Sequence, residues 1–350
     1  MGHLIDSDEI DSIIAIHIPT TPEGSDTVIE AMERAFSAEA AADKTLMTVL
    51  MGGSDSAPKM EDGRRVPAYP YPESAAQALA TAASYSEWRN KPEGTHIRPE
   101  NIDRTAGEAA IRAALKRTGG DGGWLDSDER NQLFEAYGVD SAQTRAAATE
   151  DEAVAAAEGL ESVVLKVVSD SAQHKSDIGG VVLDVRGEDA VRAAFRQVTG
   201  VVDDAQGVVV QEFVPEGHEV IVGMTEDPTF GPLVVFGLGG IYVELLQDVA
   251  FRINPLSDVD AWEMIEEPKS SRLLSGYRGT AAGDVDAVHD LLLRISAMID
   301  DLPEIAEMDL NPVKVLEPGK GIRAVDSRVK IRPVMGAFLP SRKDVPGRML

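Results

Sequence analysis

The sequence predicts a chain in two parts, the first α/β and the second mixed α+β. Up to about Pro92, short apolar runs alternate with stretches of helical spacing, as they do in parallel α/β units. From about Asp126, apolar runs follow one another closely, as in antiparallel hairpins. Between the two parts, residues 93–124 hold one helical stretch that ends in glycines, which predicts a linker.

The first part, residues 1–92, contains two strand-like and two helix-like segments. We expect the strands at 12–18 and 44–51 and the helices at 25–41 and 73–89. The part is short for a doubly wound domain and reaches a strand almost at once. The sequence therefore predicts the second half of an α/β domain, without its first strands.

The second part, residues 125–338, mixes helices with strands, and a loose tail, 339–350, follows it. A Ser-Asp pair opens its first helix, and acidic residues in the first turn favour the helix N-terminus. Helices are expected at 127–139, 149–160, 189–198 and 286–299, and strands at 162–168, 179–185, 207–213, 219–225, 232–240, 305–313 and 322–328. The closely spaced strands predict antiparallel pairs.

The composition is strongly acidic, with a formal net charge of −27 and no cysteine. Acidity on this scale is typical of proteins from salt-rich cytosols, so we expect a halophilic, cytoplasmic protein. It argues against nucleic acid and anionic membranes, which bind basic patches. No apolar run approaches the roughly 20 residues of a membrane span, and the N-terminus lacks a signal-peptide pattern. Without cysteine, covalent catalysis needs another nucleophile.

A lysine stands inside the apolar run "VVLKVV". Lys166 and Lys175 are the only lysines between Arg117 and Pro268. A strand-edge lysine whose ammonium reaches water would explain Lys166. The alternative is a fixed cation that points at phosphate oxygens.

The loop after this run brings His174 and Lys175 close in sequence to the pair Gly179 and Gly180. Glycine lets successive backbone N–H groups approach an anion closely. Most Gly-Gly pairs only form turns, so a plain turn is the alternative. Beside a lysine and a histidine, the pair favours an anion-binding loop.

A further candidate lies where two strands meet. Glu212, Phe213 and Val214 form a hinge whose backbone groups can pair with an adenine edge. Glu219, at the head of the next strand, offers a carboxylate to two ribose hydroxyls. The alternative is a surface hairpin with solvated glutamates.

The stretch "AEMDLNPV" supplies Asp309 and Asn311, which strand alternation places on one face. Asp326 follows in the next strand-like run, "AVDSR". These are hard oxygen ligands of the kind Mg²⁺ takes beside nucleotide phosphates. Pro312 is expected to end the strand ladder. A surface strand with solvated acids is the alternative.

In chain order, these features are a strand lysine, a glycine loop, an adenine hinge, a ribose carboxylate and a set of Mg²⁺ ligands. The order is typical of an ATP site between two subdomains. A P-loop is excluded, because the sequence has no G-x-x-x-x-G-K-[ST]. The stretch "FGLGGIYVE" also lacks the βαβ setting of a dinucleotide fingerprint.

Residues from about 125 to 335 resemble the ATP-grasp half of the NDP-forming (ADP-forming) acyl-CoA synthetases, an acetate–CoA ligase family related to succinyl-CoA synthetase. The motifs are "LFEAYGV", "VVLKVVSDSAQHKSDIGGV", "GVVVQEFVPEGHEVIVG", "DPTFGPLVVFGLGGIYVELLQDVAFRINPL", "GYRG", and "EMDLNPV" with "AVDSR". Residues 1–92 resemble the second half of the flavodoxin-like CoA-ligase domain that precedes it. The resemblance implies a two-subdomain ATP-grasp fold after a truncated ligase domain.

The resemblance also implies a reaction. Acyl-CoA, ADP and phosphate are converted into a carboxylic acid, CoA and ATP, through an acyl phosphate and a phosphohistidine. It assigns the nucleotide phosphates to Lys166 and to the loop at Gly179 and Gly180. Adenine would be bound by Glu212, Phe213 and Val214, and the ribose by Glu219. Mg²⁺ would be bound by Asp309, Asn311 and Asp326. His174 matches a loop histidine that carries phosphate, beside Lys175. Arg252 and Arg278 are further candidates for phosphate contacts.

The sequence departs from complete members of that family, which carry a CoA-binding Rossmann-type domain and a domain with the principal phosphohistidine. We therefore expect a fragment, a split subunit or a decayed gene. CoA would be a substrate of the complete enzyme, through a CoA-binding partner subunit or a missing N-terminal region. Oligomer formation stays open. Two other functions also stay open: the chain could be a nucleotide-binding regulatory module without turnover, or part of another ATP-grasp carboxylate ligase.

Overall fold

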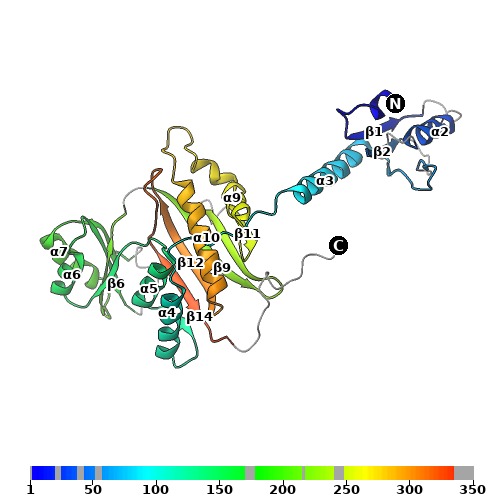
Figure 1. Cartoon of the computed structure of the whole chain (residues 1–350). Helices are drawn as coiled ribbons and strands as arrows, with labels where there is room; N and C mark the ends of the chain where they lie inside the picture. Colours follow the sequence, from blue (N-terminus) through cyan, green and yellow to red (C-terminus); the bar gives the residue numbers. More distant parts are fainter. Residues whose placement is uncertain are drawn as a thin grey trace. The chain divides into compact units, whose positions relative to one another are not determined.

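The computed structural model describes residues 2–19, 25–37, 43–51, 57–169, 178–214, 217–239 and 248–334. The chain divides into two compact units, Met1–Pro92 and Glu93–Leu350 (Figure 1). Both contain helices and strands, as the sequence predicts. Within the described residues, no helix is long and apolar enough to cross a membrane.

The first unit contains a three-stranded parallel sheet in the order β1-β2-β3. Its strands are β1 (Ser12–His17), β2 (Thr45–Leu50) and β3 (Ala68–Tyr69), and its helices are α1 (Gly2–Ile5), α2 (Ser25–Phe36) and α3 (Pro72–Asn90). Ile13 of β1 packs with Met32 and Phe36 of α2 in a small buried core. The parallel α/β pattern expected for this part is therefore present.

The second unit contains two sheets, and the smaller one has the order β5-β8-β6-β7. All its strand pairs are antiparallel. The strands are β5 (Thr144–Ala147), β6 (Val163–Val168), β7 (Val181–Val185) and β8 (Gly207–Glu212), and the helices are α6 (Glu150–Ala157) and α7 (Glu188–Thr199). Thr149 and Glu152 close a capping box at the start of α6. Apolar residues of α6 and α7 pack on one face of this sheet.

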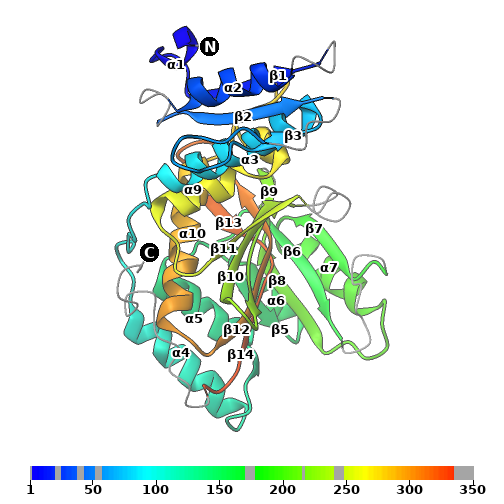
Figure 2. The same ribbon diagram turned by 90° about the vertical axis from the view of Figure 1, so that its right-hand side faces the viewer.

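The larger sheet has the order β11-β10-β9-β12-β14-β4, with β13 paired to β12. Its strands are β4 (Gly123–Trp124), β9 (His218–Asp227), β10 (Gly231–Leu238), β11 (Val249–Ile253), β12 (Ile305–Val315), β13 (Ile322–Ala324) and β14 (Ser327–Ile331). The helices are α4 (Arg104–Arg117), α5 (Ser127–Tyr137), α9 (Asp258–Glu266) and α10 (Val285–Asp301), with the 3-10 helix η2 (Lys269–Leu273). These four α-helices and the sheet share one hydrophobic core (Figure 2).

The segment expected as a linker, residues 93–124, contains α4. Ala110, Ile111 and Ala114 of this helix are buried in the core of the second unit. Ahead of the helix, Arg98 forms an ion pair with the buried Asp301, which also accepts a hydrogen bond from the Tyr137 hydroxyl. The segment is thus packed against the second unit by both apolar and polar contacts.

The prediction that Pro312 ends the strand was wrong. β12 continues through Pro312 to Val315, and its pairing with β9 shifts register between Leu310 and Val313. A bulge of this kind accommodates the missing N–H of proline without ending the ladder. The strand therefore contributes residues on both sides of the proline.

Candidate functional site

Strand alternation fixes which residues of the small sheet face away from its helices. Val163, Leu165 and Val167 of β6 are buried in the core beneath α6 and α7. Lys166 therefore lies on the opposite face of β6. Val209 and Gln211 of β8 share that face, since their neighbours Val208 and Val210 belong to the core.

The large sheet is built in the same way. Met308 and Leu310 of β12 are buried in the core, so Asp309 and Asn311 lie together on the face opposite the helices. Asp309 is the direct cross-strand partner of Arg328 on β14. The alternation predicted for the acid and the amide is therefore present, and a basic residue lies beside them.

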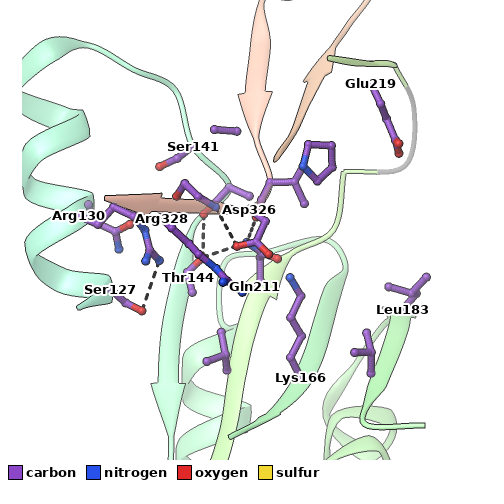
Figure 3. Close-up of a pocket in the computed structure, with 18 residues that line it drawn as sticks. Ser127, Arg130, Ser141, Thr144, Lys166, Leu183, Gln211, Glu219, Asp326 and Arg328 are labelled. Carbon is purple, nitrogen blue, oxygen red and sulfur yellow. Dashed lines mark hydrogen bonds between the residues drawn. The ribbon is translucent and has the colours of Figure 1, made fainter. Parts of the chain in front are cut away.

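A cleft of about 880 Å³ opens between these parts of the second unit. It is lined by Lys166, Glu219 and Asp326, three predicted site residues that come from separate segments of the chain (Figure 3). The other lining residues are Ser127, Arg130, Asn131, Ser141, Ala142, Thr144, Val181, Leu183, Val209, Gln211, Pro312, Ala324, Val325, Ser327 and Arg328.

The hinge residues have partners within the protein. The Glu212 N–H donates to the Gln143 carbonyl at 2.8 Å, and the Phe213 N–H donates to the Ser162 carbonyl at 3.0 Å. The Glu212 carboxylate accepts a 3.3 Å bond from the Gln143 N–H. These two hinge N–H groups are therefore already satisfied, and adenine recognition by residues 212–214 stays a prediction.

The glycine loop is described only at its end. Gly179 has φ +76°, a backbone conformation that glycine adopts readily. The Gly180 carbonyl accepts a 2.8 Å hydrogen bond from the Val167 N–H, which joins the loop to the strand of Lys166. His174 and Lys175 lie outside the residues that the structure describes.

Two predicted magnesium ligands, Asp309 and Asn311, lie on β12, and the third, Asp326, directly precedes β14, which pairs with β12. The Asn311 N–H donates to the Asp326 carbonyl at 3.0 Å, and one Asp326 carboxylate oxygen accepts a 2.8 Å bond from the Ser327 N–H. Burial raises the pKa of Asp309, and the nearby Asp326 carboxylate raises it further, while Arg328 opposes the rise. Solvent reaches Asp309, but the surrounding protein still desolvates its carboxylate.

This donor set fits Mg²⁺, because two carboxylates that repel each other are relieved by a cation and their oxygens are hard ligands. Among the described residues, no group of three or more His, Cys, Asp and Glu side chains could hold a metal. An ion here would therefore complete its shell with phosphate oxygens and water, as Mg²⁺ usually does.

Two predicted arginines do not line the cleft. Arg252 pairs with Glu267 at 2.8 Å and with Glu263 at 3.4 Å, both on or next to α9. Arg278 lies over the Tyr277 ring, 5.3 Å from its centroid, and has φ +51°. The structure does not bring these side chains to Lys166.

Sequence reasoning missed four residues near the cleft. Arg130 and Arg328 line it, and burial lowers the pKa of Arg130 against the opposing effect of Asp326 and Asp126. Gln211 is buried and ties the small sheet to the segment before β14, donating to the Val325 carbonyl at 2.6 Å.

Lys314 pairs with Glu219 at 2.8 Å. Strict alternation would place Lys314, five residues after Asp309, on the opposite face of the strand, and only the register shift between Leu310 and Val313 reverses this. Arg130 also gave no signal in the sequence, because it stands in an ordinary polar helix.

Comparison with known proteins assigns this chain to a family. The ATP-grasp domain family matches residues 116–331. The chain is 37% identical over 335 residues to an acetate–CoA ligase [ADP-forming] I from Archaeoglobus fulgidus, a match that covers 93% of this chain and 47% of that protein. The chain thus spans about half the length of this relative.

Two shorter proteins match over nearly their whole length. The chain is 37% identical to the acetate–CoA ligase [ADP-forming] I subunit beta of Pyrococcus furiosus, over 63% of this chain and 97% of that subunit. A structure of dinucleotide forming acetyl-coenzyme A synthetase 1 from Ca. Korarchaeum cryptofilum, in complex with coenzyme A and Mg-AMPPCP, is 40% identical, with a TM-score of 0.56 over 65% of this chain and 100% of that one. The chain therefore belongs to the family of ADP-forming acetate–CoA ligases that carry an ATP-grasp domain.

Proposed function

We propose that this chain is the nucleotide-binding part of an ADP-forming acyl-CoA synthetase. The observation that supports the proposal most directly is one cleft lined by Lys166, Glu219 and Asp326, which come from three separate parts of the sequence. In the proposed reaction, acyl-CoA, ADP and phosphate are converted into a carboxylic acid, CoA and ATP. The chain contributes the half that handles phosphate and nucleotide.

Each predicted site residue has a role that follows from its chemistry. Lys166 supplies a positive charge to nucleotide phosphates, and Glu219 accepts hydrogen bonds from the ribose hydroxyls. Asp309 and Asn311 on β12, with Asp326 just before β14, would hold Mg²⁺. When bound, the ion neutralises charge on the phosphate oxygens, which is most of what phosphoryl transfer requires.

His174 is the proposed phosphoryl carrier, beside Lys175. The bond between the γ-phosphorus and its bridging oxygen breaks, a phosphorus–nitrogen bond forms, ADP leaves, and the imidazole gives up its proton. A neutral imidazole suits this step because it is nucleophilic near neutral pH. In the related Korarchaeum structure a phosphohistidine segment points towards the nucleotide binding site, which supports a histidine-borne phosphoryl group in this reaction but does not identify the histidine.

CoA chemistry is assigned to a partner. One relative is named a beta subunit, and the chain covers 97% of it. We therefore propose that a second subunit or a further region binds CoA and carries the principal histidine. Arg252 remains a candidate phosphate contact only if a nucleotide releases it from Glu263 and Glu267.

Labelling with [γ-³²P]ATP and Mg²⁺, in the presence of the CoA-binding partner, tests the proposal. The expected product is an acid-labile, base-stable phosphoprotein that His174→Gln abolishes. Acetyl-CoA, ADP and phosphate should then yield ATP. Unlabelled wild-type protein would remove the histidine carrier from the proposal. Nucleotide binding without any ATP formation would leave a regulatory module.

A further inference from the structure

Gln211 on β8 is a buried polar side chain in the lining of the cleft. It is 5% exposed, and its neighbour Val210 lies in the core with α6 and α7, so the carboxamide points away from those helices. Its Nε2 donates two hydrogen bonds, at 2.6 Å to the Val325 carbonyl and at 3.2 Å to the Thr144 hydroxyl (Figure 3). Thr144 belongs to the same sheet, as the direct partner of Gln211 on β5. Val325 lies between β13 and β14, so the other bond crosses from the small sheet to the large one.

The oxygen of the Gln211 carboxamide makes this arrangement costly. The buried Oε1 atom accepts no hydrogen bond from any residue that the structure describes. Turning the amide over would bring this oxygen against the Val325 carbonyl oxygen, and two acceptors repel each other. A buried oxygen without a partner costs free energy, whereas an apolar side chain of similar size would fill the space without that cost. Packing alone therefore does not account for a glutamine at this position.

The Val325 peptide that Gln211 holds leads directly into the proposed metal site. The Val325 N–H donates to the Pro312 carbonyl of β12 at 2.9 Å, so Val325 is fixed through its N–H by the large sheet and through its carbonyl by the small one. The next residue is Asp326, whose carbonyl accepts a 3.0 Å bond from the Asn311 N–H. Because side chains occupy staggered rotamers on their backbone, a shift of this segment would move the Asp326 carboxylate with it.

We propose that Gln211 is a positioning residue for the metal site, which aligns the Asp326 carboxylate from the small sheet through the Val325 carbonyl. The inference rests on the proposed function and deepens it. Lys166 pairs with Val209 on β8, two residues before Gln211, so the lysine and the amide share one face of the small sheet. The strands that present the phosphate-binding lysine thus also hold the segment of the metal-binding acid. Groups that orient metal ligands in this way contribute strongly to metal affinity.

Gln211→Met tests the proposal, because methionine keeps the length of the side chain and removes its donors. Mn²⁺ binding to the ADP complex, followed by electron paramagnetic resonance of free Mn²⁺, should weaken by about tenfold. The affinity for metal-free ADP, measured by calorimetry, should stay within about twofold, since Gln211 acts through Asp326. In an Asp326→Asn background, Gln211→Met should weaken Mn²⁺ binding no further. Gln197→Met, on the exposed surface of α7, is the control and should change neither affinity.

A second measurement needs no ligand. If Gln211 holds residues 325–326, the Asn311 N–H, which bonds to the Asp326 carbonyl, should exchange with deuterium faster in Gln211→Met than in wild type. The Val198 amide in α7 should exchange at its wild-type rate, because the fold is intact. Gln211→Asn keeps an amide but is one methylene too short to reach Val325. It serves as the second variant and should show the same losses.

Unchanged Mn²⁺ affinity in the folded variants would overturn the positioning role. So would an equal loss of Mn²⁺ and metal-free ADP affinity with faster exchange throughout the small sheet, because Gln211 would then only support the fold. If no form of the protein binds ADP, the proposed function fails instead. The exchange of the Asn311 amide then still decides whether Gln211 holds this segment.

Discussion

Lys314 on β12 and Glu219 on β9 are direct partners across two neighbouring strands, with Nζ and Oε1 2.8 Å apart. The lysine side chain is 18% exposed and the glutamate side chain 44% exposed. Lys314 thus holds one oxygen of a carboxylate that lines the cleft. The other oxygen remains for a ligand, so the ion pair orients Glu219 for the ribose contact that we propose.

Replacing this lysine should weaken nucleotide binding. Lys314→Met leaves the Glu219 carboxylate unpaired and no longer oriented for the ribose hydroxyls. We expect ADP affinity to fall by about fivefold, the effect of losing a partly exposed ion pair. Isothermal titration calorimetry of ADP measures the effect. The double variant with Glu219→Gln should lose little more than Glu219→Gln alone. Additive losses would mean that Lys314 does not act through Glu219.

The charge of Lys166 should matter for phosphates and not for the nucleoside. A charge-assisted hydrogen bond contributes about 1.5–3 kcal/mol, so Lys166→Met should reduce ATP and ADP affinity by about 10–100-fold. Adenosine binding should stay within about twofold, because it has no phosphate. Lys330→Met is the matched control, since Lys330 lies over the Trp124 ring and outside the cleft lining. An equal loss for adenosine would point to a damaged fold.

Local sequence patterns are sufficient to predict the position of side chains whose face is set by strand alternation. Lys166 stands in an apolar run whose alternate members Val163, Leu165 and Val167 fill one core. Asp309 and Asn311 alternate with the buried Met308 and Leu310. In these cases the period of two decides which face a side chain takes. The sequence therefore predicted correctly that Asp309 and Asn311 share one face of their strand.

Other parts of the site depend on contacts between distant segments. Arg130 looks like a solvated helix residue in the sequence, and only the packing of α5 turns it toward the cleft. Arg252 looked available for phosphate, but Glu263 and Glu267 pair with it from α9. The occupied N–H of Phe213, which bonds to Ser162, likewise follows from tertiary structure.

The acids on β12 and beside β14 should bind a divalent ion together with nucleotide. Asp309→Asn is expected to weaken Mn²⁺ binding to the ADP complex by about tenfold, measured by electron paramagnetic resonance of free Mn²⁺. Metal-free ADP should bind as tightly as before or more tightly, because a negative charge is removed. Glu307→Gln, the preceding residue on the same face of β12, serves as the control. Unchanged Mn²⁺ affinity in Asp309→Asn would exclude the carboxylate from the metal site.

The stability of the second unit should depend on pH through Glu129 at the start of α5. A 2.8 Å hydrogen bond from Arg117 holds the pKa of Glu129 below its usual 4.5, and the capping bond to the Asp126 N–H adds to this. Since the folded pKa is the lower one, the stabilisation is complete above the unfolded pKa. It is lost as pH falls through the folded value.

Glu129→Gln should therefore destabilise the protein by about 2 kcal/mol at pH 7, and the difference from wild type should shrink as the pH falls below about 4.5. Urea unfolding at a series of pH values measures it. Glu108→Gln is the matched control, because its two arginine partners, Arg104 and Arg112, are largely exposed. A difference that does not change with pH would show that lost packing, and not charge, explains the effect.

Salt should stabilise the whole chain. The net charge of −27 makes self-repulsion large at low ionic strength, where the Debye length is about 30 Å at 0.01 M, whereas molar salt reduces it to about 3 Å. We expect the thermal unfolding midpoint to rise steadily from low to molar KCl. The same series in a variant with several exposed acids replaced by their amides, for example Glu87, Asp121 and Asp189, should show a smaller rise. A midpoint that is equal at both extremes of KCl would contradict the salt-adapted surface, because the repulsion that salt screens would then contribute nothing to stability.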